Sequence, residues 1–190
     1  MGLTLPRQGK ARQGKARIYL RMTEEVRKHL YTPEAKLEWF GEGPWVDEPD
    51  LLEFTHNGIE CRIIRVISKD GPNHVFGGHL CGYICLPKES KYYGKAYDDI
   101  PIEVHGGLTF GQNGDVGQWI GFDCAHSVDV VPSMIKNKNE IIDKCIKDYP
   151  HLAKSRIFED SYKQIYFVIQ ECKSMADQLI ALDNSSEPIV

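Results

Sequence analysis

The dipeptide Asn57-Gly58 limits what this chain can fold into more than any other short feature of its sequence. It separates two apolar segments, residues 51–56 and residues 59–67. Asparagine followed by glycine readily adopts positive φ at both central positions of a type I′ turn, which joins antiparallel strands. The sequence therefore predicts an antiparallel β-hairpin over these two segments.

Three further apolar segments predict additional strands. They are residues 75–86, in which several glycines would bend the strand, residues 102–110 and residues 118–124. The glycine-rich residues 111–117 between the last two predict a turn-rich connection. Together with the hairpin, these segments predict an α+β domain with a mostly antiparallel sheet from about residue 51 to residue 124.

Helical patterns flank the predicted sheet. Thr23 would cap a short helix within residues 22–31, and Ser133 opens a second helical segment that ends at a proline, at residues 133–150. Over residues 162–180, apolar side chains recur at steps of three and four, which is typical of an amphipathic helix. We expect a short N-terminal helix and two C-terminal helices on one face of the sheet. The last helix could instead pair with another subunit in a homo-oligomer.

Composition predicts one globular domain over residues 22–182, because 42% hydrophobic residues in a chain of this length can form a single core. Residues 1–21 contain six basic side chains, no acidic one and a duplicated Arg-Gln-Gly-Lys-Ala, which predicts a disordered basic tail or a non-native extension. Residues 183–190 are expected to fray. The remaining chain holds 17 of the 23 basic side chains against all 27 acidic ones, so a nucleic-acid partner is disfavoured and a small anionic ligand is expected.

Six cysteines occur without a preceding secretory segment, which favours reduced thiols in a cytoplasm. The apolar runs are far shorter than the roughly 18 residues that a membrane span requires. We therefore expect no membrane association.

Two motifs concentrate the chemically active side chains. Residues 103–110 read EVHGGLTF and residues 121–126 read GFDCAH. With Cys81-Gly82-Tyr83, Pro87-Lys88 and residues 93–99, they resemble a family of uncharacterised small proteins encoded by bacteriophages and prophages.

The resemblance extends from about residue 58 to residue 129 and resumes weakly over residues 166–179. Val128 departs from it, since the family has glycine there. The resemblance implies a phage setting, hence the host cytoplasm, and a shared site. By analogy it also favours a protein that acts on host nucleotide metabolism or on nucleotide immune signals.

Alternation along the two predicted strands brings candidate site residues together. If Val104 and Phe122 both face the core, then His105 and Asp123 both face away from it and would meet across paired strands. His126 lies three residues after Asp123. The sequence therefore predicts a site that combines two imidazoles with a carboxylate.

Two hydrolytic arrangements remain open for this site. Without metal, His105 and His126 would act as acid and base while Thr109 or backbone amides stabilise the developing charge. Alternatively, a divalent metal bound by these histidines, Asp123 and Asp129 would activate water. Asp129, three residues after His126, would reach its imidazole across one helical turn. A divalent metal is the cofactor that this second arrangement would use.

Glycines and tyrosines near the motifs are candidates for ligand binding. Gly106 and Gly107 would form a bulge or let a ligand approach backbone N–H groups. Three tyrosines of the polar segment 88–99 would cover the site as a lid; they are Tyr92, Tyr93 and Tyr97.

The leading hypothesis is a phage-type hydrolase, such as a phosphodiesterase, acting on a small phosphorylated or nucleotide-like ligand. One alternative is a non-catalytic protein that sequesters such a ligand to counter host defence, and another is a structural or inhibitory interaction protein. Cys124 is disfavoured as a nucleophile because alternation turns it toward the core, whereas His79 could join the site.

Overall fold

The hairpin at Asn57-Gly58 is present in the computed structural model, which describes residues 26–69, 75–135, 147 and 162–185. Asn57 has φ 50° and Gly58 has φ 88°, the positive values that this turn requires. β2 (Leu51–His56) pairs antiparallel with β3 (Ile59–Lys69) on either side of the turn. The prediction of an antiparallel hairpin is confirmed.

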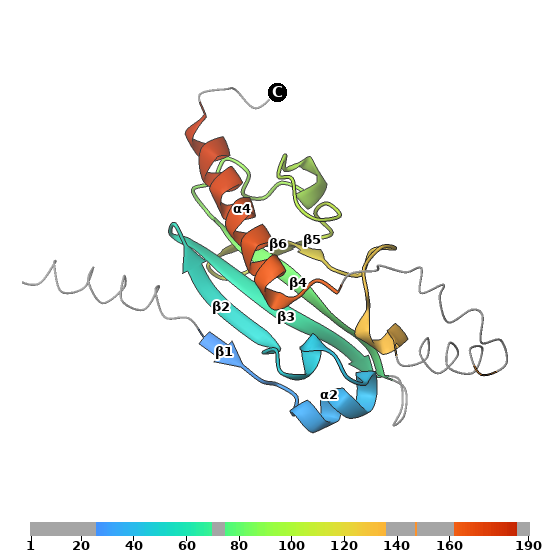
Figure 1. Cartoon of the computed structure of the whole chain (residues 1–190). Helices are drawn as coiled ribbons and strands as arrows, with labels where there is room; N and C mark the ends of the chain where they lie inside the picture. Colours follow the sequence, from blue (N-terminus) through green and yellow to red (C-terminus); the bar gives the residue numbers. More distant parts are fainter. Residues whose placement is uncertain (1–25, 70–74, 136–146, 148–161, 186–190) are drawn as a thin grey trace, which may run out of the picture.

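The sheet has six strands in the order β1-β2-β3-β4-β6-β5, and every neighbouring pair is antiparallel (Figure 1). The other strands are β1 (Val26–Lys28), β4 (Val75–Pro87), β5 (Phe110–Asn113) and β6 (Gly117–Asp123). The fold is therefore α+β with a mostly antiparallel sheet, as predicted.

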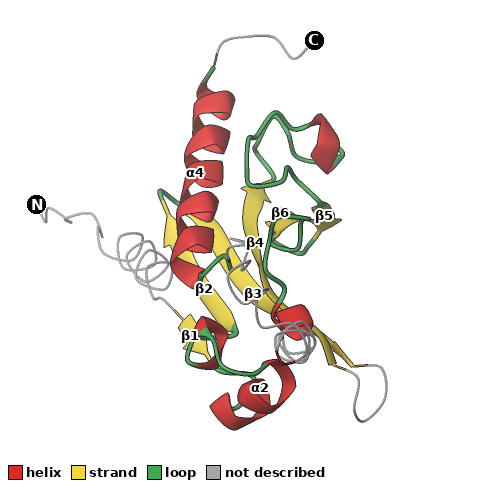
Figure 2. Ribbon diagram, turned by 45° about the vertical axis from the view of Figure 1, so that its right-hand side comes forward, coloured by secondary structure: helices red, strands yellow, loops and turns green. Residues whose placement is uncertain are grey.

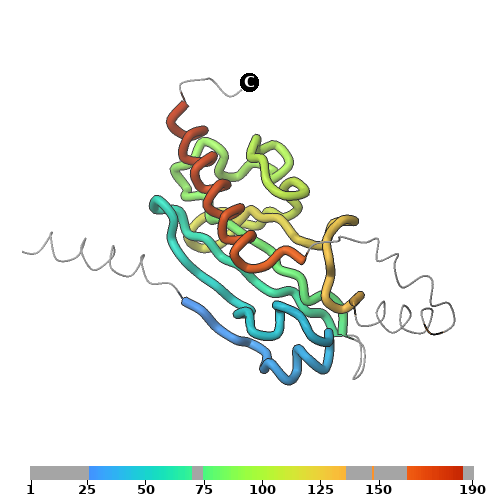
Figure 3. Tube along the Cα trace, viewed as in Figure 1, coloured from blue at the N-terminus to red at the C-terminus, as the bar shows by residue number. Residues whose placement is uncertain are grey.

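The predicted strand over residues 102–110 is wrong except at its last residue. Residues 102–109 form a loop, in which Gly106 and Gly107 have φ of 69° and 86°. These left-handed conformations turn the chain, so a pleated strand cannot run through them. Figure 3 traces this loop beside α4, and Glu103 N–H donates to Gln178 Oε1 at 2.8 Å.

α4 (Ile165–Asn184) lies along one face of the sheet and packs on β3 and β4 (Figure 2). Its buried side chains recur at helical spacing and are Val168, Cys172, Met175, Ala176 and Leu179. Gly82 of β4 allows the close approach, because a Cβ there would overlap Phe122 and Cys172. α4 ends two residues beyond the predicted domain, and Asp183 Oδ1 accepts hydrogen bonds from Ser90 and Lys91.

The N-terminal helix lies later in the chain than predicted. Val26–Lys28 is strand β1, and the helix is α2 (Pro33–Phe40). Thr32 Oγ1 accepts a hydrogen bond from Ala35 N at 3.2 Å, and Pro33 occupies the first turn, where its missing N–H costs nothing. Short 3₁₀ turns follow at η1 (Pro44–Val46) and η2 (Tyr97–Asp99).

Parts of other predictions lie outside the described residues, including the basic segment 1–21. Of the helix predicted over residues 133–150, the structure describes residues 133–135 and Lys147, all of which are helical. The five described cysteines are buried and free. None of the helices in the described ranges is both long and apolar enough to cross a membrane.

Candidate functional site

The carboxylate of Asp129 brings the two predicted histidines together. Asp129 Oδ2 lies 2.8 Å from His105 Nε2, and it accepts a hydrogen bond from the backbone N–H of His126 at 3.0 Å. His126 Nδ1 lies 3.3 Å from the same oxygen. The two imidazole rings are nearly perpendicular, with centroids 5.2 Å apart. One acidic side chain therefore positions both rings.

A tight turn after β6 places His126 and Asp129 side by side. The backbone N–H of Asp129 donates to the carbonyl of His126 at 2.8 Å, which closes one turn of chain. The prediction that Asp129 lies near this imidazole is confirmed. Val128 lies on the outside of the turn with 63% of its surface exposed and no positive φ, so the turn accommodates valine at this position.

The glycine pair shapes the loop that carries His105. The N–H of Gly107 donates to the carbonyl of Val104 at 2.9 Å, so residues 104–107 form a turn and not the predicted bulge. At Gly106 the backbone has φ 69°, and a Cβ there would overlap the ring of His126. Because Gly106 has no side chain, the imidazole of His126 can lie against the backbone there.

α4 and the residues just before it supply three contacts to the site that the sequence motifs do not indicate. Glu171 Oε2 accepts the backbone N–H of His105 at 2.7 Å, and the ring of Phe167 meets the His105 ring edge-on at 5.4 Å. Lys163 Nζ lies 3.7 Å from Asp129 Oδ1. Phe167 and Glu171 are four residues apart and share one side of α4, and Lys163 lies two residues before the helix begins. The spacing of Phe167 and Glu171 is the available signal for these contacts.

Asp129 remains ionised at neutral pH despite its burial. Burial by itself raises the pKa of a carboxyl group, but hydrogen bonds from His105 and the backbone of His126 outweigh it, so the pKa of Asp129 lies below its ordinary value. A charged carboxylate beside a histidine fixes the tautomer and the orientation of the ring.

The same three side chains suit a divalent metal ion. One ligand atom from each of His105, His126 and Asp129 lies within 4.8 Å of the others, and no second group of this kind occurs in the described part of the chain. Imidazole nitrogen and carboxylate oxygen are ligands that zinc and other divalent transition metals accept.

A pocket of about 250 Å3 opens beside His126 and Asp129. It is lined by these two residues together with Ala125, Ser127, Val130, Val131, Met134 and Ile135. The side chains of His105 and His126 are 17% and 28% exposed, whereas that of Asp129 is inaccessible. A small ligand in this pocket can therefore reach the imidazole of His126, whereas His105 is partly exposed but is not among the residues that line the pocket.

The structure separates Asp123 from this cluster. Its Oδ1 accepts the N–H of Ala125 at 3.0 Å, and alternation from the buried Phe122 places it on the face of β6 turned away from α4. The predicted contact of Asp123 and His105 across paired strands is wrong, because β6 pairs with β4 and β5. Thr109 is exposed, and its N–H donates to Gly121 O at 2.8 Å.

The three tyrosines of the proposed lid lie elsewhere. Tyr92 is buried in the core, Tyr93 is half-buried, and Tyr97 packs against the core. Tyr97 lines a different pocket of about 420 Å3, with Lys95 and Gln112 among its other residues. None of the three tyrosines is among the residues that line the pocket beside His126.

Cys124 faces the core, as alternation predicted. It is 2% exposed, and burial raises the pKa of its thiol well above the ordinary value. A buried thiol in this state is a poor nucleophile.

Comparison with protein-family models, with curated proteins and with solved structures gives no match to this chain. The fold and the site define an α+β protein in which a buried carboxylate holds two partly exposed imidazoles. The function must be inferred from this geometry.

Proposed function

We propose that this chain is a hydrolase that acts on a small phosphorylated or nucleotide-like ligand, with His105 and His126 as the acid and base. The observation that carries the proposal is the single buried carboxylate of Asp129, which contacts both imidazoles beside an open pocket. Two imidazoles in one site can serve as the proton donor and the proton acceptor in the cleavage of a phosphate ester.

Each imidazole keeps one nitrogen for chemistry. His105 Nε2 and His126 Nδ1 lie against Asp129, while His105 Nδ1 and His126 Nε2 have no hydrogen-bond partner in the described part of the chain. When one nitrogen donates a hydrogen bond to Asp129, the lone pair is on the other nitrogen, which can then accept a proton from water. The second imidazole, when protonated, would donate to the leaving oxygen.

Lys163 partly neutralises the carboxylate that holds this pair. Its ammonium lies 3.7 Å from Asp129 Oδ1, and its side chain is 18% exposed. A cation at this distance partly offsets the charge of the carboxylate, which would otherwise repel a phosphate. Lys163 therefore lowers the repulsion that an anionic substrate would meet at this site.

Turnover by purified protein tests the proposal. The substrates are bis(p-nitrophenyl) phosphate, p-nitrophenyl phosphate and a panel of linear and cyclic nucleotides. His105→Ala and His126→Ala should each lower turnover by roughly 10²- to 10⁴-fold, the usual contribution of a general acid or base. The matched control is His56→Ala, because His56 Nε2 also contacts a carboxylate, that of Asp177 at 2.9 Å, in the β2–β3 hairpin region.

Dialysis against EDTA separates the two hydrolytic arrangements. If activity is lost and returns with zinc or manganese, His105, His126 and Asp129 act as metal ligands and the ion activates water. If activity survives dialysis, the imidazoles act directly.

Two outcomes would contradict the hydrolase. Recovery of a bound nucleotide intact, without turnover by the wild type, would favour sequestration. Loss of the folded state in both alanine variants, with no turnover of any substrate by the wild type, would favour a structural role.

A further inference from the structure

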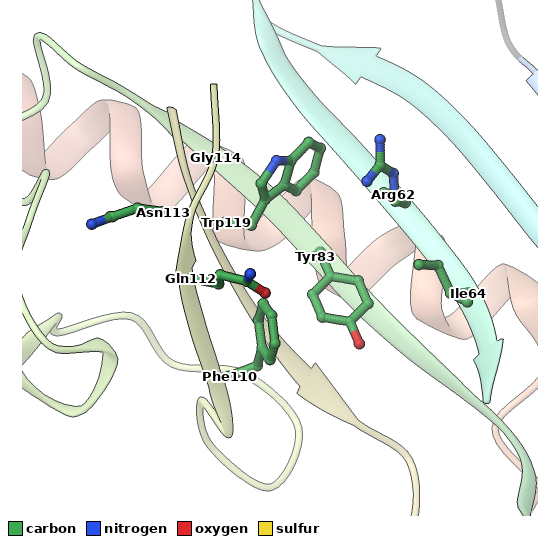
Figure 4. Close-up of a pocket in the computed structure, with 8 residues that line it drawn as sticks. All are labelled: Arg62, Ile64, Tyr83, Phe110, Gln112, Asn113, Gly114 and Trp119. Carbon is green, nitrogen blue, oxygen red and sulfur yellow. The ribbon is translucent and has the colours of Figure 1, made fainter. Parts of the chain in front are cut away.

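A third hollow lies on the face of the sheet that is turned away from α4 (Figure 4). Its base is a row of residues in register across neighbouring strands, in which Arg62 is opposite Tyr83, Tyr83 is opposite Gly121, and Gly121 is opposite Phe110. Cross-strand neighbours in register are close enough for their side chains to touch.

Gly121 lets the side chain of Tyr83 lie across this row. A Cβ at this position would overlap the ring of Tyr83 and the carbonyl of Gly82. Without it, the Tyr83 ring reaches across β6 to Phe110, where the two rings meet edge to face with centroids 5.2 Å apart. Figure 4 shows the Tyr83 ring between Phe110 and Ile64.

Trp119 and Arg62 form the opposite wall. The Arg62 guanidinium lies 4.5 Å from the centre of the Trp119 ring, and Arg62 Nε donates to Glu53 Oε1 at 2.7 Å. Glu53 and Trp119 therefore both hold the guanidinium in place. The hollow has a volume of about 290 Å3 and is completed by Ile64, Gln112, Asn113 and Gly114.

We infer that this hollow is a binding site for a neutral purine nucleoside of the adenosine type. Its volume lies near the lower end of the range of small-molecule sites, so it suits one such ligand and not a polymer. The rings of Tyr83, Phe110 and Trp119 offer flat apolar contacts for a base, and stacking on aromatic side chains binds bases strongly.

The polar groups of the hollow favour adenine and disfavour phosphate. Gln112 lines the hollow, and its amide has no hydrogen-bond partner in the described ranges. A glutamine amide can pair with both N6 and N7 of adenine. Arg62 is the only cation that lines the hollow and Glu53 already neutralises it, so the pocket as described offers no excess positive charge for a phosphate group.

This inference is independent of the proposed hydrolase. Trp119 and Tyr83 lie on the face opposite the one on which His105 contacts Phe167 of α4. Adenosine contains no phosphate ester, so its binding is measured without turnover. Failure of one proposal therefore leaves the other intact.

Isothermal titration of the full chain with adenosine, 7-deazaadenosine and AMP tests the inference. Wild type should bind adenosine more tightly than 7-deazaadenosine, which lacks the N7 acceptor, and should gain nothing from the phosphate of AMP. Trp119→Ala should weaken adenosine binding by roughly tenfold, the scale of one lost stacking contact. Gln112→Ala, at an exposed position that should tolerate alanine, should abolish the preference for adenosine over 7-deazaadenosine.

The matched control is Tyr166→Ala, because Tyr166 is a 70% exposed aromatic residue on α4. Its binding should equal that of wild type. Absence of saturable adenosine binding at about 1 mM, or equal binding by wild type and Gln112→Ala, overturns the inference. Two further results would also overturn the inference. One is tighter binding of single-stranded RNA than of adenosine, and the other is a dimer whose formation depends on Trp119 and excludes adenosine.

Discussion

The imidazole of His126 lies against the backbone of Gly106, in the space that any side chain at position 106 would occupy. Two loops that are distant in sequence therefore fit together at this contact. The loop before β5 carries His105, and the loop after β6 carries His126 and Asp129. Their fit brings both imidazoles to one carboxylate.

Gly106→Ala should displace His126 and reduce turnover about as much as His126→Ala does. Alanine at φ 69° also costs about 1–2 kcal/mol of folding free energy, because left-handed backbone crowds its Cβ. Chemical denaturation measures the stability, and the histidine ring signals in a long-range ¹H–¹⁵N NMR spectrum report the displacement.

Gly107→Ala separates the two effects. Gly107 has a similar φ of 86°, but a Cβ there meets nothing within 4 Å. It should lose similar stability while its histidine signals and turnover stay near those of wild type. Equal histidine signals in the two glycine variants would contradict the contact that we describe.

Asp129→Asn should lower turnover by at least about a hundredfold and destabilise the fold by about 2 kcal/mol. The neutral amide keeps the size of the side chain but loses the charge that accepts from His105 Nε2 and His126 N–H, and bonds to charged groups are the stronger class. Asp177→Asn is the control, because that exposed carboxylate holds His56. The turnover and melting temperature of Asp177→Asn should match those of wild type. If Asp129→Asn and Asp177→Asn behave alike, the proposed role of Asp129 is contradicted.

Local chemistry explains which parts of the fold could be predicted. Asn57-Gly58 specifies a hairpin through backbone conformation alone, and the three-and-four spacing of residues such as Val168 and Cys172 specifies α4. By contrast, Ile102 and Val104 alternate as a strand would, and only the positive φ of the next glycines ends the pattern. The sequence does not show in advance that both glycines adopt it.

The candidate site was predicted in part for the same reason. The spacing of His126 and Asp129 indicated their contact, because one turn of chain is a local property. Choosing between Asp123 and Asp129 required knowing which face of β6 meets α4, and that depends on packing. Lys163 and Glu171 reach the site across more than 30 residues of chain, which no local pattern reveals.

His79→Leu should reduce the loss of stability in mild acid. Burial lowers the pKa of His79 below its ordinary value of 6.5, and its Nδ1 is buried without a hydrogen bond among the described residues. The unfolded chain therefore binds a proton at a higher pH than the folded chain does. The contribution of neutral His79 to stability is complete above pH 6.5. It is lost as the pH falls from 6.5 through the pKa of His79 in the folded chain.

Urea denaturation at several pH values from about 8 to about 5 measures this effect. The stability of His79→Leu relative to wild type should grow as the pH falls below the ordinary histidine value. A difference between the two proteins that stays constant over this range would show that His79 does not titrate with folding.

Arg65→Met should destabilise the fold far more than Arg62→Met, although the two arginines lie three residues apart on β3. The Arg65 side chain is inaccessible, and it donates to Asp50 Oδ1 at 2.8 Å, to Gly78 O at 2.7 Å and to Glu48 Oε2 at 3.0 Å. Removing it leaves a buried carboxylate with less compensation, which typically costs about 3–5 kcal/mol. Arg62 pairs with Glu53 at 38% and 34% exposure, and such pairs contribute about 0–1 kcal/mol. Urea denaturation of both variants checks the difference, and equal losses would mean that the Arg65 network contributes no more than a surface pair.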